Sequence, residues 1–237
     1  MNDMLNHRSF RIATLRAVAF ITDSKLEAKT VLRRLPEKWM ERFNGEYLLI
    51  PPFDDAPPEL PILLLRSHAK DDQCAFSSIS VDFRHSPRNP DLTQSDDLLK
   101  TFYSDACDYL LELPIVLDCE LTRVGAVVTR YARLDQPGLT LAKHFCKAEM
   151  LHSPLNRPES FELHAHKLYS AMGRSVNSWV RVKTGKVNSN EDAVLVEQDI
   201  NTPSVGRQGL TMDAAREFFQ IVPSEMEEIL SKYFKSE

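Results

Sequence analysis

The sequence predicts an α+β fold, in which an antiparallel sheet carries three to four amphipathic helices on one side. The first observation is the segment Leu121–Leu134, where apolar and mixed side chains alternate with the period of a β-strand. The second is the order of elements, because predicted strands come in groups separated by single helices, unlike the regular alternation of a doubly wound sheet. The third is the low content of 7 glycines, with no glycine-rich phosphate-binding motif.

The predicted central strand separates its side chains onto two faces. One face is apolar and carries Thr122, Val124, Ala126, Val128 and Ala132. The other face is mixed and carries Arg123, Gly125, Val127, Thr129, Tyr131 and Arg133. Because valine is β-branched and favours a pleated, half-buried surface, we expect the strand to bury its valine side.

The first half of the chain predicts a strand, a helix, three further strands and a second helix. Pro36 lacks the N–H group that a helix interior needs, so we expect it to split the first helix. The predicted ranges are Phe10–Ile21 (strand), Lys25–Phe43 (helix), Tyr47–Ile50, Ile62–Arg66 and Cys74–Arg84 (strands), and Leu98–Leu113 (helix).

The second half repeats this order after the central strand. The predicted ranges are Leu139–Met150 (helix), Ser160–Ser170, Val176–Lys183 and Ala193–Ile200 (strands), and Thr211–Phe234 (helix). We expect a turn at Lys183–Lys186, and an interruption of the last helix at Pro223. Residues 1–237 are therefore expected to form one domain, in which 10–114 and 115–237 are two similar halves of a pseudo-duplicated β-α-β-β-β-α arrangement.

Composition argues against a membrane protein and against a disulfide scaffold. No apolar run approaches the roughly 20 residues that a transmembrane helix needs. The first ten residues, MNDMLNHRSF, lack the apolar core of a secretory signal. The 4 cysteines, Cys74, Cys107, Cys119 and Cys146, are widely spaced and form no CxxC pair. We therefore expect a cytoplasmic protein with reduced thiols and no membrane partner.

Charge is segregated along the chain, although the net charge of −5 is unremarkable. Residues 51–120 carry 5 basic and 14 acidic groups, whereas residues 121–186 carry 11 basic and 4 acidic groups. The basic span also contains the aromatic residues Tyr131, Phe145, Phe161, Tyr169 and Trp179, and basic groups with stacking aromatics on a sheet can hold single-stranded nucleic acid. The candidate contacts are Arg123, Arg130, Tyr131, Arg133, Lys167, Arg181 and Lys183. The alternative is that these aromatics belong to the core.

Glu162, His164 and His166 form a candidate metal site. Positions i, i+2 and i+4 of a strand share a face, so a carboxylate and two imidazoles would converge there, as zinc prefers. This pattern suggests a metal-dependent hydrolase. The alternative is a solvated polar face, because Phe161, Leu163 and Ala165 occupy the opposite side.

Two further groups of reactive side chains are weaker candidates. Cys146 lies near His144 and His152, but residues two positions apart on a helix do not face each other, so a buried free thiol is the simpler interpretation. Asp82, Asp118 and Asp199 are possible paired carboxylates, although acidic residues at strand ends more often cap turns.

Several segments resemble a sporadically distributed family of bacterial conserved hypothetical proteins of similar length. The resemblance is carried by PPFDDAPPELPILLLRS (51–67), SSISVDF (77–83), TRVGAVVTRYARL (122–134) and VEQDINTP (196–203). The family's strand usually carries an arginine–glycine pair followed by an aromatic and a polar residue. Here Arg123 and Gly125 fit, but Ala126–Val128 replaces that continuation. The resemblance implies an α+β fold and a bacterial or phage-related cytoplasmic protein, with no catalytic residues to carry over.

The absence of a catalytic motif leads us to expect a non-enzymatic protein that binds another protein. A regulatory or toxin-immunity subunit of a bacterial system fits this expectation, and a homo-oligomer is compatible with it. Nucleic-acid binding by residues 121–186 is the first alternative, and a zinc-dependent hydrolase is the second. Without zinc, no cofactor is expected. A contiguous positive face would favour nucleic acid, whereas an exposed apolar sheet edge would favour a protein partner.

Overall fold

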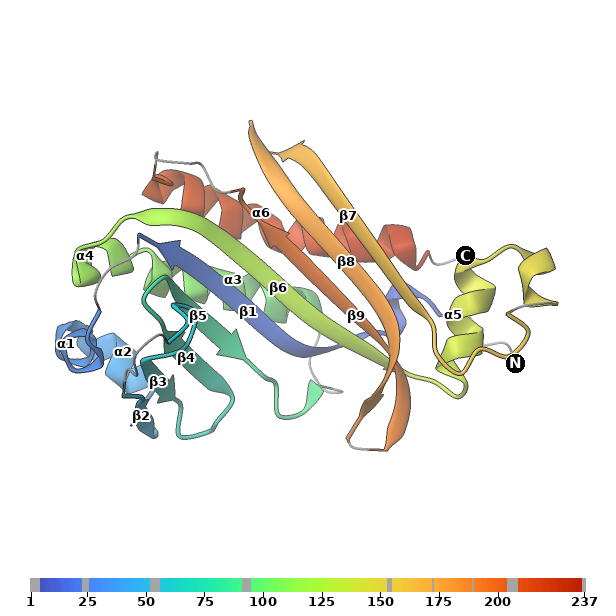
Figure 1. The fold of residues 1–237 in the computed structure, drawn as a ribbon, viewed down its shortest axis with the longest axis horizontal. Coiled ribbons are helices and arrows are strands. Elements are labelled where there is room, and N and C mark those ends of the chain that lie inside the picture. The colour runs from blue at the N-terminus through green and yellow to red at the C-terminus, as the bar shows by residue number, and fades with distance from the viewer. Residues whose placement is uncertain are drawn as a thin grey trace.

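The computed structural model describes residues 5–22, 26–51, 56–90, 95–152, 155–171, 173–188, 190–203 and 209–235. Part of the proline-rich stretch after Pro51 lies outside these residues. The protein has a mixed α+β fold, as predicted (Figure 1).

A nine-stranded antiparallel sheet forms the centre of the molecule, with the strand order β2-β3-β4-β5-β1-β6-β9-β8-β7. The first half of the chain contributes β1 (Arg11–Ile21), β2 (Tyr47–Leu49), β3 (Leu63–Arg66), β4 (Asp72–Phe76) and β5 (Ser80–His85). The second half contributes β6 (Leu121–Arg133), β7 (Glu162–Ala171), β8 (Arg174–Val187) and β9 (Glu191–Asn201). The edge strands are therefore β2 and β7.

All of the helices that contribute to the core pack on one face of this sheet. The long helices α3 (Ser95–Leu110) and α6 (Met212–Tyr233) lie behind the sheet in Figure 1, and none of the described helices lies on its near face. The shorter helices are α1 (Ala28–Arg34), α2 (Glu37–Arg42), α4 (Leu113–Leu117) and α5 (Pro137–Phe145), with the 3₁₀ segments η1 (His7–Ser9) and η3 (Ala148–Leu151). We call the uncovered side of the sheet the open face.

The central strand β6 buries the side that its alternation predicts. Val124, Ala126 and Val128 are fully buried under the helices. The neighbouring β1 places Ala19, Ala17 and Leu15 directly opposite them. Burial of a valine side chain contributes about 1.5–3 kcal/mol, so this row of apolar pairs fixes which face of the sheet receives the helices.

The core between the sheet and the helices falls into two clusters. The larger one includes Trp39 from α2, whose ring contacts Phe76 of β4 and Tyr109 of α3 at centroid distances of 5.7 and 5.1 Å. The smaller one lies under α5, where Leu141 packs near Val182 and Phe234. Both clusters lie on the helix side of the sheet.

Three local predictions were wrong, and in each case an interaction beyond the local sequence explains why. The predicted strand Cys74–Arg84 is two strands, because the Ser77 hydroxyl accepts hydrogen bonds from the backbone of Ile79 and Ser80 and closes a turn. The predicted turn at Lys183–Lys186 is strand, because β9 pairs with β8 as far as Val187. Helix α6 continues through Pro223, which is itself buried.

The two halves of the chain have related connections, but the first half contributes five strands and the second four, so β2 has no counterpart. In each half the first strand lies beside the last, with β1 next to β5 and β6 next to β9, and a long helix follows the last strand. The first strands of the two halves pair with each other at the middle of the sheet. None of the helices in the described part of the chain combines the length and apolar content that crossing a bilayer requires.

Candidate nucleic-acid interface

One row of side chains crosses the open face from β3 to β7. Residues directly opposite one another on paired strands share a face, so the strand registers place the whole row on the same side. The row consists of Arg66, Gln73, Arg84, Arg16, Val127, Asp199, Trp179 and His166. The neighbouring residues Leu65, Phe83, Ala17 and Ala126 are fully buried on the helix side, which identifies the row as belonging to the open face.

Arginine dominates the part of the open face formed by β1, β3, β5 and β6. We call this group the arginine patch, and it comprises Arg11, Arg16, Arg66, Arg84, Arg123 and Arg133. On the open side of these four strands, which the structure describes in full, Asp82 is the single acidic residue. Arginine offers a planar set of donors that matches phosphate and stacks on rings, so the patch is suited to an anionic ligand.

The arginine patch contains a like-charged pair at its centre. Arg16 of β1 lies directly opposite Arg84 of β5, an arrangement that is unfavourable unless an anion offsets it. Asp82 supplies part of the compensation, because Arg16 donates to its two carboxylate oxygens at 2.5 and 3.3 Å. The hydrogen bond to Asp82 raises the pKa of Arg16, and the negative charge of Asp199 adds to this effect, while burial opposes it.

Two arginines of the patch have donors that the described residues leave unsatisfied. The Nε atoms of Arg84 and Arg123 are buried and have no hydrogen-bond partner among those residues. The guanidinium carbon of Arg123 lies 3.8 Å from the ring centroid of Phe20, which is directly opposite on β1, so the two side chains form a cation–π contact. Buried donors without partners are costly, and an anion above the sheet would stabilise both guanidinium groups through their positive charge.

A stacked pair of rings occupies the opposite end of the row. His166 of β7 and Trp179 of β8 lie with centroids 4.0 Å apart and an interplanar angle of 9°. The His166 Nε2 atom is hydrogen-bonded to Asn177, the Asn177 amide donates to Asn201 at 3.2 Å, and the Asn201 amide donates to Asp199 at 2.9 Å. Because the carboxylate accepts, both amides are oriented, and His166 is held as the Nε2–H donor.

The predicted nucleic-acid contacts divide between the two faces. Arg123, Arg133, Arg181 and Lys183 lie on the open face, as their alternation requires. Tyr131 also lies on that side, but it is 4% exposed, under the guanidinium of Arg133. The prediction that a base stacks on Tyr131 is therefore wrong, because the ring is buried.

Arg130 and Lys167 are corrections to the predicted interface. Arg130 lies on the helix side of β6, fully buried, where it bonds to Gln198 and to Glu227 of α6. Lys167 lies on the helix side of β7, 4.9 Å above the ring of Tyr169. The period-two pattern places Arg130 beside Val128 and Ala132, so the sequence already contained the signal that excludes it.

Sequence reasoning missed the arginines from the first half of the chain. Arg11, Arg16, Arg66 and Arg84 lie outside the basic span 121–186, and no local pattern marks them. They join Arg123 because β1 pairs with both β5 and β6. Only the strand order brings the six side chains together.

Glu162, His164 and His166 share the open face of β7, but they do not converge on one point. His164 pairs with Glu162 at 2.7 Å, and this hydrogen bond lowers the pKa of Glu162. His166 turns to Trp179 and Asn177 instead. The described residues contain no group of three or more His, Cys, Asp or Glu that could hold a metal ion.

The remaining candidate residues are dispersed. The His144 ring lies 2.7 Å from the carbonyl oxygen of Tyr233 and stacks on Phe234, away from any role as a base for Cys146. Asp82 and Asp199 lie within strands of the open face on either side of Arg16, contrary to the predicted strand-end positions. Asp118 ends α4 in a left-handed conformation, outside the strands that carry Asp82 and Asp199.

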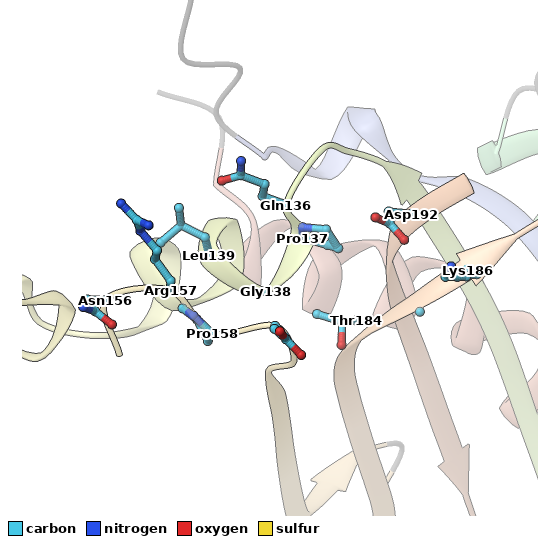
Figure 2. Close-up of a pocket in the computed structure, with 12 residues that line it drawn as sticks. Gln136, Pro137, Gly138, Leu139, Asn156, Arg157, Pro158, Thr184, Lys186 and Asp192 are labelled. Atoms are coloured by element: carbon cyan, nitrogen blue, oxygen red, sulfur yellow. The ribbon is translucent and has the colours of Figure 1, made fainter. Parts of the chain in front are cut away.

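A cavity of about 810 Å³ lies at the far end of the sheet, next to the N-terminus of α5 (Figure 2). Its walls come from residues 136–139, 156–159, 184–186 and 192. Gly138 brings two of these walls close together, because a Cβ there would lie 2.3 Å from the Pro158 carbonyl oxygen. In Figure 2 Arg157 points away from Lys186 and Asp192 on the facing hairpin, so the charged groups do not converge on a ligand.

The arginine patch and the stacked rings are therefore the strongest candidate site in the described part of the chain. Comparisons with protein-family models, with curated proteins and with solved structures gave no match, and the candidate interface rests on its own geometry.

Proposed function

We propose that the protein binds single-stranded nucleic acid across the open face of its sheet. The observation that carries the proposal is the arginine patch, with two arginine Nε atoms that lack a partner among the described residues, in one row with a stacked His166–Trp179 pair. Cationic side chains that follow the phosphate backbone, with rings on which bases stack, are the general means of binding single strands.

The distribution of acidic residues supports the proposal despite the net charge of −5. Exposed carboxylates gather on the helix layer, at Asp97 and Asp108 of α3 and at Asp213, Glu217 and Glu228 of α6. The open face also carries the carboxylates Glu162, Glu197 and Asp199, but its part on β1, β3, β5 and β6 sets six arginines against Asp82 alone. Such an arrangement orients a polyanion toward the open face as it approaches.

Fluorescence anisotropy with labelled single-stranded RNA and DNA tests the proposal. Arg66→Ala and Arg181→Ala should each weaken binding, and should reduce the slope of log K against log salt concentration by about 0.7 for each phosphate that is no longer neutralised. Arg216→Ala on α6 is the matched control, because the side chain of Arg216 is 52% exposed and that of Arg181 is 48% exposed, each paired with one carboxylate. This control should bind like the wild type.

Two results would overturn nucleic-acid binding. The first is no change in anisotropy with any oligonucleotide at low salt. The second is competition by poly-glutamate at an equal concentration of charges, because that outcome would assign the arginine patch to an acidic protein.

A protein partner is the second candidate, as the absence of a catalytic motif leads us to expect, and a specific observation favours it. At the β2 edge of the sheet Tyr47, Leu48 and the nearby Leu60 are 55%, 54% and 42% exposed. Unpaired strand edges with exposed apolar side chains are common sites of protein association. A partner that binds the wild type and Arg66→Ala equally, but does not bind Leu48→Glu, would support this function.

We also propose that residues 10–114 and 115–237 are two copies of one β-α-β-β-β-α unit. The shared neighbours of the first and last strands and the pairing of the two first strands support this idea, with β2 as an additional strand of the first half. Superposition of the two halves tests it, since corresponding strands must coincide in order and direction.

A further inference from the structure

The two ends of the transverse row differ in chemistry. Arg66, Arg84 and Arg16 supply donors for phosphate at one end, whereas Trp179 and His166 supply ring faces at the other. Between them lies Asp199, a carboxylate that repels phosphate. A surface that bound only the phosphate backbone would carry cations along the whole row. Here the cations stand at one end and the rings at the other, so the row combines phosphate-binding positions with a base-stacking position.

We infer that His166 and Trp179 form a subsite for one terminal base of a single strand that crosses the sheet along this row, at right angles to the β-strands. The inference rests on the proposed function. It assigns to the row a ligand with free base faces, because the bases of a duplex are already stacked on one another and present only their edges in the grooves.

The subsite is held in place before any ligand arrives. Asp199 fixes Asn201, Asn201 fixes Asn177, and Asn177 holds the Nε2–H of His166, so that the imidazole stays parallel to the Trp179 ring. Asn177 and Asn201 are thus positioning residues. A ring that is already oriented loses little conformational freedom when a base stacks on it.

The dimensions of the row limit the length of the ligand. The row crosses eight strands, and seven strand spacings of about 4.8 Å give about 34 Å. A stacked single strand advances about 3.4 Å per nucleotide, and an extended one advances further, so about ten nucleotides are the most that the row can contact.

An abasic scan tests the subsite. Each position of an oligonucleotide of about ten residues, made as RNA and as DNA, is replaced in turn by an abasic residue, and anisotropy is measured with the wild type and with Trp179→Ala. We expect the abasic residue to weaken wild-type binding about tenfold at one terminal position, and to have no further effect at that position in Trp179→Ala. His166→Ala on the exposed edge strand should show the same coupling without altering an interior strand.

Tyr47→Ala is the control, since Tyr47 is an exposed aromatic residue at the opposite edge of the sheet and should leave the scan unchanged. Coupling to a central position, or coupling to none while the oligonucleotide still binds, would overturn the terminal subsite and leave nucleic-acid binding intact. Affinity that keeps rising well beyond about ten nucleotides would overturn the path along the row. Absence of binding to every oligonucleotide would instead remove the proposed function itself.

Discussion

Replacing Glu227 by alanine removes the carboxylate that faces the buried guanidinium of Arg130. The side chain of Arg130 is 0% exposed, whereas that of Glu227 is 26% exposed, and their closest atoms lie 2.5 Å apart. Removing one partner of a buried ion pair costs about 3–5 kcal/mol, because the other charge stays desolvated. Since Gln198 still bonds to Arg130 and water reaches the site from the Glu227 side, we expect a loss of about 2–4 kcal/mol.

Arg130→Met should be less harmful than Glu227→Ala, although it removes the same ion pair. Methionine fills much of the arginine volume without burying a charge, and Glu227 can turn toward solvent. The remaining cost arises at Gln198, which is 1% exposed and whose side-chain oxygen loses its arginine donor. We expect this to lower the free energy of unfolding by about 1–2 kcal/mol. The double variant should be no less stable than Arg130→Met alone.

Urea and thermal denaturation of the wild type and the three variants, followed by circular dichroism, measure these differences. For a chain of this size, about 2–4 kcal/mol corresponds to a decrease in Tm of about 5–15 °C. The reasoning is refuted if the effects of the two single changes are additive in the double variant, or if Arg130→Met is the more destabilising change. Either result would mean that the charge of Arg130 is not what Glu227 offsets.

Two further changes test the packing and the protonation of buried groups. Gly138→Ala should destabilise the protein by about 1–3 kcal/mol in the same assay, because its Cβ would lie 2.3 Å from a backbone oxygen. Gly125→Ala, whose nearest contact is 3.4 Å, is the control, and equal effects of the two changes would contradict the packing argument. Burial, assisted by the charge of Asp108, raises the pKa of the Cys107 thiol from 9.0 to about 11. The folded state then binds more protons than the unfolded state between pH 9.0 and about 11, so stability should fall as the pH rises through that range. Cys107→Ala should show a smaller decline, and an identical pH dependence would exclude this thiol as the cause.

Most of the secondary structure was predictable because it depends on local periodicity. The range Leu121–Arg133 is a strand with Val124 and Val128 buried, and Pro36 separates α1 from α2. The prediction failed where contacts between distant segments outweighed local preference. Helix α6 continues through Pro223 because Phe219, Val222 and Met226 pack into the core on either side of it.

The candidate site was only partly predictable. Alternation alone placed Arg123 and Arg133 on the uncovered side of β6. The same alternation excludes Arg130, whose basic character outweighed its position in the sequence-based assignment. The contribution of Trp179 depends on His166 lying directly across from it on β7, which is a matter of strand register.

The sequence by itself determined where most of the strands lie and which side of β6 is apolar, because side chains alternate along a strand with a period of two residues. Only the tertiary structure decided that Arg16, Arg66 and Arg84 lie in one row with Asp199 and Trp179. The physical reason is that strand order and register arise from the burial of distant apolar faces against each other, a property that no local segment of the chain contains.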